Sequence, residues 1–233
     1  DVVGLDTTVN VSRNLLQGLP KDESKDTFKL PKIVEELYNK KWWGDKTKQG
    51  FFKKTVNDKG EKEILELNLK TLEYGSRTKA SFKSLEEVKD IESVKERLPK
   101  LINATDKAGE FYRATFYDVF RYCSMRIPEI ADELYKIDQA VCAGFAWELG
   151  PFETWDLVGV KATAEKMKAA GMKVAPWVHE MLAAGNNSFY KFEKGQKLYY
   201  DIPSKAYKPI PGKEGLIILD AFKENKVVWS NAG

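Results

Sequence analysis

Apolar residues recur at helical spacing in two well-separated parts of the chain. In both parts the apolar positions fall three or four residues apart, and a glycine follows the last of them. Because glycine readily adopts the left-handed backbone that ends a helix, each pattern predicts a short amphipathic helix with a glycine cap. The first pattern comprises Leu5, Val9, Ser12, Leu15 and Leu16 before Gly18; the second comprises Val160, Ala164, Met167 and Ala170 before Gly171.

Each of these predicted helices is followed by the same series of signals. Pro31 and Pro176 each begin a further apolar pattern, and proline is tolerated at the first helical position because its missing N–H would be unpaired there. Next, two strand-like segments flank a charged turn with glycine, which predicts a β-hairpin. These segments are FFKK (51–54) with EILEL (63–67), and FYKF (189–192) with KLYYD (197–201).

The two series also begin and end alike. DVVGL (1–5) matches DLVGV (156–160), and NLKTLEY (68–74) matches DIPSKAY (201–207). Matched landmarks in one order predict an internal duplication. We therefore expect a mainly α-helical chain of two related lobes, each with a short β-hairpin, packed about a pseudo-twofold axis. The predicted segments are a first copy over 1–80, a connecting helix over 81–106, a complete second copy over 107–210 and a C-terminal linker over 211–233.

The second copy carries a long helical region before DLVGV that the first copy lacks. Asp106 is expected to cap its first helix, Pro128 to open a second with Ile130, Ala131 and Leu134 inward, and a third to run from near Ile137 to Gly144. In the connecting helix, Ser84 and Glu87 form a capping-box pattern, and Pro99 should kink or end the helix. The expected buried stripe of the first helix is Ala108, Phe111, Tyr112, Thr115, Phe116, Val119, Phe120 and Cys123.

This difference in length between the copies has a consequence for assembly. The first copy, shortened at its N-terminal side, should expose apolar surface that the long helices would cover. We expect a neighbouring chain to cover it, so that the protein forms a homo-oligomer.

Composition and charge narrow the function classes. The chain has 42% hydrophobic and 31% charged residues and a net charge of +3, without a basic stripe, which argues against a nucleic-acid partner. No apolar run approaches the length that a membrane span needs, so no membrane partner is expected. Cys123 and Cys142 are expected to be thiols in a reducing cytoplasm.

Two stretches resemble the C-terminal domains of 3-hydroxyacyl-CoA dehydrogenases. They are IDQAVCAGFAWELGPFETWDLVGV (137–160) and GDKTKQGFFKK (44–54). The tandem arrangement is similar to that of multifunctional β-oxidation proteins, and ENKVVWSNAG (224–233) looks like a linker to a fused enoyl-CoA hydratase domain.

The resemblance implies an enzyme that oxidises (S)-3-hydroxyacyl-CoA to 3-ketoacyl-CoA with NAD and without a metal. It implies a Rossmann domain before residue 1 that holds the NAD site and the catalytic His–Glu pair. No GxGxxG motif occurs in this chain, so the phosphate cradle for NAD is not encoded here. The isolated chain is therefore expected to be inactive, and no catalytic residue is expected in it.

The same resemblance gives weak candidates for substrate binding. In the loop Lys46, Thr47, Lys48, Gln49 and Gly50, lysine side chains could reach a phosphate of CoA, although Lys48 stands where the family has glycine. Arg126 matches the arginine of a family Asn–Arg pair, but Met125 replaces the asparagine. Methionine cannot hydrogen-bond as an amide does, so we expect the second copy to be structural.

Two alternatives stay open. The 46–50 loop could simply connect a helix to the hairpin, and the chain could be a purely structural dimerisation module without ligand contact. His179 corresponds to Val34 in the first copy, which favours a partly buried structural position over a general base. Glu148, Glu153 and Asp156 are expected to serve as helix-entry caps.

Overall fold

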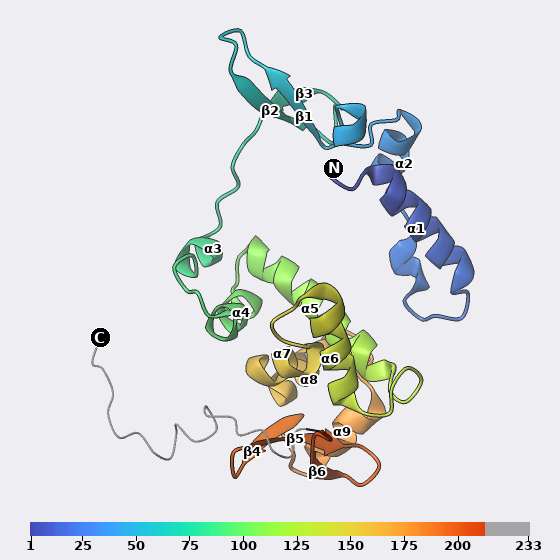
Figure 1. Cartoon of the computed structure of the whole chain (residues 1–233), viewed down its shortest axis with the longest axis vertical. Helices are drawn as coiled ribbons and strands as arrows, with labels where there is room; N and C mark the ends of the chain where they lie inside the picture. Colours follow the sequence, from blue (N-terminus) through green and yellow to red (C-terminus); the bar gives the residue numbers. More distant parts are fainter. Residues whose placement is uncertain (213–233) are drawn as a thin grey trace. The chain divides into compact units, whose positions relative to one another are not determined.

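The computed structural model describes residues 1–212 (Figure 1). The chain folds into two compact units, of which the first comprises Asp1–Ala80 and the second begins at Ser81. The predicted linker over 211–233 lies almost entirely outside the described residues. Each unit is described by itself.

The first unit consists of two short helices and one small sheet. Its core is formed by Leu5, Val9, Leu37 and Leu67, with aromatic residues packed around them. The helix predicted over 5–18 is confirmed, but its predicted glycine cap is wrong, because Gly18 is the last helical residue and Leu19 is the C-cap. Pro31 precedes its helix as the N-cap. The elements are α1 (Leu5–Gly18), η1 (Lys25–Phe28), α2 (Lys32–Asn39), η2 (Asp45–Thr47), β1 (Phe52–Val56), β2 (Lys62–Leu67) and β3 (Tyr74–Ser76).

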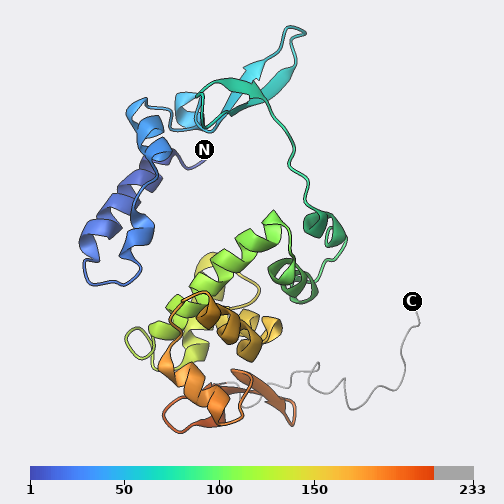
Figure 2. The same ribbon diagram turned by 180° about the vertical axis from the view of Figure 1, so that it is seen from behind.

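The second unit packs its helices against a second small sheet. Its core centres on aromatic rings, with Phe120 and Trp155 stacked 5.1 Å apart. Seen from behind, the sheet closes one end of this helical unit (Figure 2). The elements are α3 (Lys83–Glu87), α4 (Val94–Asn103), α5 (Lys107–Met125), α6 (Leu134–Phe145), α7 (Pro151–Val158), α8 (Val160–Ala169), α9 (Pro176–Ala183), β4 (Tyr190–Glu193), β5 (Gln196–Asp201) and β6 (Ala206–Pro209).

The mainly helical class is confirmed, and each predicted hairpin is present with one further strand. Both sheets are antiparallel, in the orders β1-β2-β3 and β4-β5-β6. The third strands come from NLKTLEY (68–74) and DIPSKAY (201–207) or directly follow them. These strands are only three and four residues long, too short for a periodic pattern to reveal them. How the predicted lobes pack together stays a prediction.

Predictions for the helices around α5 need correction. Asp106 caps α5 as expected, but the buried stripe is rotated: Tyr117 and Ser124 are buried, while Phe111 is 68% exposed. Pro128 opens no helix, and Ile130 is 71% exposed. The buried apolar positions resume at Leu134, where one helix, α6, replaces the two that were expected.

The connecting segment also differs from its prediction. Ser84 makes no capping box, because its amide and hydroxyl both donate to the carboxylate of Asp106, at 2.9 Å each. The segment is broken into α3 and α4, and Pro99 lies inside α4 without ending it. The turn after Pro99 buries Leu101 and Ile102. Burial of such side chains contributes roughly 1.5–3 kcal/mol each, which offsets the hydrogen bond that proline removes.

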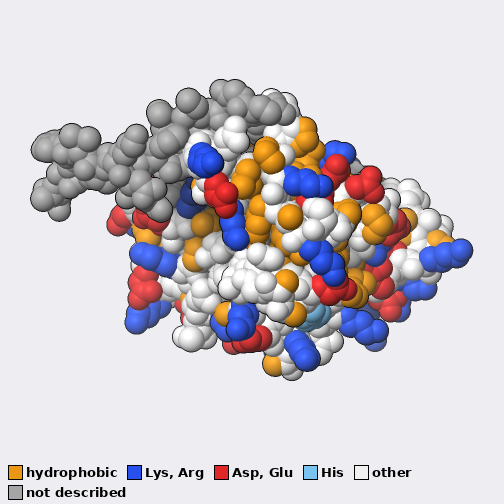
Figure 3. Space-filling view, turned by 90° about the horizontal axis from the view of Figure 1, so that it is seen from below, with side chains coloured by type: hydrophobic (Ala, Val, Ile, Leu, Met, Phe, Trp, Pro, Cys, Tyr) orange, Lys and Arg blue, Asp and Glu red, His pale blue; other side chains and the backbone are white. Residues whose placement is uncertain are grey.

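Charged side chains of both signs are interspersed on the surface. On the face seen in Figure 3, lysine, arginine and acidic side chains alternate with apolar patches and form no stripe of one sign. Among residues 1–212, no helix is long and apolar enough to span a bilayer.

Candidate functional site

The predicted loop 46–50 forms a tight turn that is held by its own backbone. The amide of Gly44 donates to the carbonyl of Gln49 at 2.8 Å. Thr47 Oγ1 lies within this turn, where it accepts from the amide of Trp43 at 2.8 Å and lies 3.1 Å from the carbonyl oxygen of Gln49. The hydroxyl of Thr47 and the backbone carbonyl of Gln49 therefore stabilise the turn.

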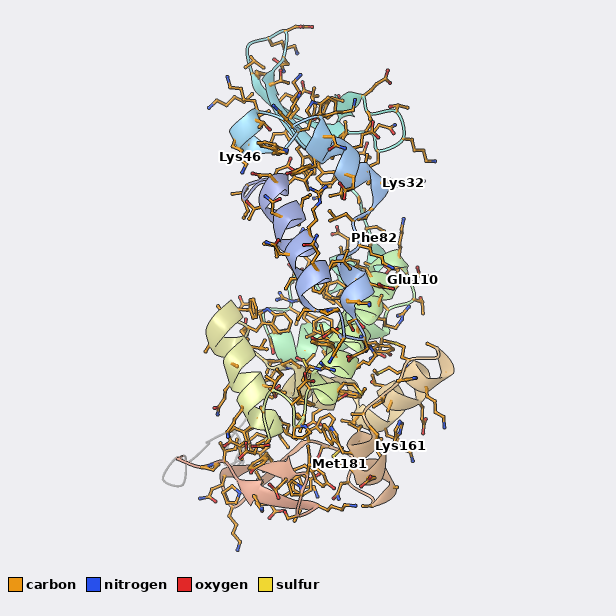
Figure 4. The ribbon with its side chains drawn as sticks, turned by 90° about the vertical axis from the view of Figure 1, so that its right-hand side faces the viewer. Lys32, Lys46, Phe82, Glu110, Lys161 and Met181 are labelled. Atoms are coloured by element: carbon orange, nitrogen blue, oxygen red, sulfur yellow. The ribbon has the colours of Figure 1, made fainter. Side chains whose placement is uncertain are left out.

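Lys46 is engaged in an ion pair within the first unit. It lies on η2 (Figure 4), and its ammonium group donates to Asp6 at 2.7 Å. This hydrogen bond lowers the pKa of Asp6 below its ordinary value. Lys46 thus ties the loop to the first turn of α1, so its ammonium group already has a carboxylate partner.

Position 50 favours glycine because Asp1 packs closely against it. A Cβ atom at Gly50 would lie 2.7 Å from Asp1 Oδ1, so any larger residue would force the carboxylate to move. The carbonyl of Gly50 accepts from the hydroxyl of Tyr74 at 2.7 Å. Gly50 therefore anchors β3 and the N-terminal segment to the loop.

Lys48 is the loop residue whose side chain is directed to solvent. It adopts a left-handed backbone, with φ of 65°, at the position where the resembling family has glycine. Its side chain is exposed, and within the described part of the chain no hydrogen bond or ion pair is assigned to its ammonium group. Of the five loop candidates, Lys48 is best placed to meet an anion.

Arg126 belongs to the second unit and has local partners. Its guanidinium pairs with Glu129 at 2.9 Å and lies 4.8 Å from the centre of the Tyr122 ring. Its side chain is only 15% exposed. Arg126 is therefore held by partners within the second unit. His179, which we expected to be partly buried, is exposed on α9.

A buried polar network in the second unit was not anticipated from the sequence. Asp138 is 3% exposed and accepts from the amides of Phe152 and Glu153, at 2.8 and 3.0 Å, and from the hydroxyl of Tyr190 at 2.8 Å. Burial raises its pKa to about 7. Since Leu134 and Asp138 are four residues apart on the buried face of α6, an aspartate at an apolar helical position was the available signal.

Asp156 is the second carboxylate of this network. Burial raises its pKa to about 7. Contrary to prediction, it caps no helix entry: it lies inside α7 and accepts from the amides of Phe189 and Tyr190, at 2.7 and 2.8 Å. Glu153 does fulfil its predicted role, because its side chain accepts from the amide of Gly150 at the start of α7, while Glu148 is exposed and makes no described cap.

Two small cavities flank the ion pair between Lys197 and Glu153. One has a volume of about 250 Å³ and reaches Leu157 and Phe192, and the other, of about 210 Å³, reaches Cys142. Within residues 1–212, every carboxylate of this network accepts hydrogen bonds from backbone amides, so its geometry supports a structural role. No metal-ligand group of three side chains is found in the described residues.

The two units repeat a set of contacts at matched sequence positions. Asp1 accepts from the amides of Phe51 and Phe52, at 3.3 and 2.9 Å, as Asp156 does from those of Phe189 and Tyr190. The hydroxyl of Tyr74 donates to Gly50, and that of Tyr207 donates to Ser188 at 2.5 Å. The glycine before each helix is left-handed, with φ of 102° at Gly4 and 94° at Gly159.

Comparison with known proteins finds relatives in the family that the sequence resembles. The chain is 40% identical over 234 residues to a "probable 3-hydroxyacyl-CoA dehydrogenase" of Bacillus subtilis, a match that covers 100% of this chain and 29% of the relative. The predicted relationship to 3-hydroxyacyl-CoA dehydrogenases is confirmed. The chain is also 27% identical to two proteins, of Rickettsia felis and Rickettsia prowazekii, each described as a "putative fatty acid oxidation complex trifunctional enzyme". These matches cover 83% and 66% of this chain and 25% and 20% of those relatives.

The chain is short compared with these relatives. It spans less than a third of the length of each of these relatives. No family model and no solved structure matches the chain.

Proposed function

We propose that this chain is the C-terminal portion of a cytoplasmic, NAD-dependent (S)-3-hydroxyacyl-CoA dehydrogenase of fatty-acid β-oxidation. The observation that carries the proposal is the 40% identity to the Bacillus subtilis relative along the whole chain. The contacts that recur around Asp1 and Asp156 support a further part of it, namely that residues 1–80 and 107–210 derive from one duplicated domain.

The chain's own residues do not fit an NAD site. The sequence has no GxGxxG motif, and the sheets of residues 1–212 are antiparallel meanders. Neither provides the strand–turn–helix cradle that binds a dinucleotide. We therefore assign NAD binding and proton transfer to the remainder of the parent enzyme. The role proposed here is to close over acyl-CoA and to support packing of the assembly.

Catalytic inactivity of the isolated chain is tested by an assay of the reverse reaction. Mixed with acetoacetyl-CoA and NADH, the purified chain is expected to leave the absorbance of NADH unchanged. A steady decrease that depends on the concentration of the chain would contradict the proposal.

Contact with CoA is tested at Lys48. Since Lys46 already pairs with Asp6, Lys48→Ala should weaken binding of CoA in calorimetry more than Lys46→Ala. Lys59→Ala, at an exposed position of the β1–β2 turn, is the matched control and should bind as the unmodified chain does. Equal loss in Lys48→Ala and Lys59→Ala would show a nonspecific charge effect.

A second candidate function is a purely structural dimerisation module. It is favoured because Thr47 and the backbone carbonyls of Gln49 and Gly50 make contacts that hold the loop within its own unit. Absence of CoA binding by the unmodified chain, together with a concentration-dependent dimer in sedimentation, would support this module and contradict closure over acyl-CoA.

A further inference from the structure

In the second unit, helix α7 covers Phe189, the residue directly before the first strand of the repeated sheet. Phe189 is fully buried, and its ring lies 5.1 Å from that of Phe152 and 5.2 Å from that of Trp155, both on α7. Asp156, on the same helix, accepts from the amide of Phe189. One helix thus supplies both the aromatic cover and the carboxylate.

The corresponding surface of the first unit is open. Phe51, the counterpart of Phe189, is only half-buried, and Thr8 is exposed where its counterpart Thr163 is 1% exposed. Val2 and Val3 are 87% and 73% exposed. Apolar residues surround an open cavity of about 630 Å³, lined by Val2, Val3, Leu5, Leu30, Val34 and Phe51.

The adjoining sheet face is open in the same way. In the second unit α6 covers this face: Tyr190 bonds to Asp138, and Tyr199 packs on Tyr135 at 4.7 Å. Tyr190 and Tyr199 are paired across β4 and β5, as Phe52 and Glu66 are across β1 and β2. Phe52 is 40% exposed, and Glu66 is also exposed.

We propose that the first unit is a docking surface for a helix pair of the α6–α7 kind that leads directly into Asp1. The carboxylate of Asp1 already makes the two amide contacts that Asp156 makes at the end of α7. The contacts that fix the end of the docked α7-type helix are therefore already present. The cavity beside them has apolar walls that suit aromatic side chains.

The counterparts also specify the chemistry of the incoming helices. The α7-type helix carries two aromatic residues three positions apart, as Phe152 and Trp155 are, to fill the cavity over Phe51. The α6-type helix meets Phe52 and Glu66 where α6 meets Tyr190 and Tyr199. It therefore presents an apolar residue to Phe52 and a basic or hydrogen-bond-donating residue to Glu66.

The test adds a second copy of residues 130–155 immediately before Asp1 of the full chain, with Asp138→Leu in the added copy so that an apolar residue meets Phe52. Amide hydrogen exchange is expected to slow at least tenfold at Phe51, Phe52 and residues of α1, with the second unit unchanged as the internal reference. The control carries Phe152→Asp and Trp155→Asp in the added copy only, and should exchange at the rates of the unmodified chain. Unchanged exchange in the first fusion, or equal slowing in both, would overturn the proposal.

A measurement without fusion keeps the test independent of how the added segment folds. A labelled peptide of residues 134–155, which stops before the place taken by Asp1 and carries Asp138→Leu to meet Phe52, should bind the full chain saturably in fluorescence anisotropy. Val34→Asp, in the cavity wall, should reduce its affinity at least tenfold, whereas Val11→Asp, on the exposed side of α1, should not. If the chain instead forms a dimer in which Val34 and Phe51 are protected, a second copy is the occupant and the proposal is wrong. Neither measurement depends on dehydrogenase activity.

Discussion

The hydroxyl of Tyr190 donates a hydrogen bond of 2.8 Å to the carboxylate of Asp138, and both side chains are more than 90% buried. Asp138 also accepts from two amides at the start of α7. One carboxylate therefore joins α6, α7 and β4. Because a buried acceptor that loses a donor keeps its desolvation cost, this junction should be sensitive to small changes.

Replacement of Tyr190 by phenylalanine tests this junction. Tyr190→Phe keeps the ring and removes one of three donors to Asp138, so the free energy of unfolding should fall by about 1–3 kcal/mol. Urea denaturation of the full chain measures the change. Tyr112→Phe is the control, since the hydroxyl of Tyr112 has no hydrogen bond assigned within residues 1–212; a similar loss there would argue against the role given to Tyr190.

The same carboxylates predict a pH dependence of stability. Burial raises the pKa of Asp138 and Asp156 to about 7 in the folded chain, from an ordinary value of 3.8. Between these values the folded state holds protons that the unfolded state has released, so the free energy of unfolding should decrease as pH rises from about 4 to about 7. Urea titrations across this range should show a smaller slope in Asp156→Asn. An unchanged slope would contradict the assignment.

Lys48, the left-handed residue of the loop, gives a substitution that should stabilise the fold, unlike Tyr190→Phe. Lys48 has φ of 65°, a conformation that costs a residue with a Cβ atom roughly 1 kcal/mol and glycine almost nothing. Lys48→Gly should therefore raise the free energy of unfolding of the first unit by up to about 1 kcal/mol. Gly44→Ala should lower it, because the added Cβ would lie 2.2 Å from the carbonyl oxygen of Asp1. Thermal unfolding followed by tryptophan fluorescence distinguishes the two variants.

The hydroxyl of Thr47 makes a separate contribution to the same loop. Thr47→Val retains the shape of the side chain but leaves the amide of Trp43 without its 2.8 Å acceptor. A loss of about 1–2 kcal/mol is expected in the first unit. Thr78→Val, at an exposed position after β3, should change stability by less than about 0.5 kcal/mol. Equal effects would show that the hydroxyl of Thr47 is dispensable.

Local signals in the sequence were sufficient for part of the fold. Both glycine-ended helices, the helix that starts at Pro176 and both hairpins were predicted, because helical spacing and glycine turns are written in neighbouring residues. The errors occurred where partners distant in sequence decide. Asp106 draws Ser84 away from a capping box, and packing of α5 places Tyr117 inward and leaves Phe111 outward.

The candidate site shows the same limit. The sequence identified residues 46–50, but it could not show that Lys46 would pair with Asp6, forty residues away. It also missed Asp138, whose importance depends on Tyr190, fifty-two residues away. Conversely, the match between DVVGL (1–5) and DLVGV (156–160) correctly paired Asp1 with Asp156, whose contacts are equivalent, although the sequence did not predict those contacts.

The stacked pair Phe120 and Trp155 provides the second unit with an internal optical reporter. The rings are nearly parallel, at 6°, and Trp155 is completely shielded from water, so its indole should emit at short wavelength until the unit opens. Trp42 and Trp43 of the first unit are partly accessible, and Trp147 of the second unit is 40% exposed, so a small quencher such as iodide should reach these three while Trp155 stays protected. The short-wavelength emission that iodide leaves unquenched would thus report the opening of the second unit in an unlabelled sample.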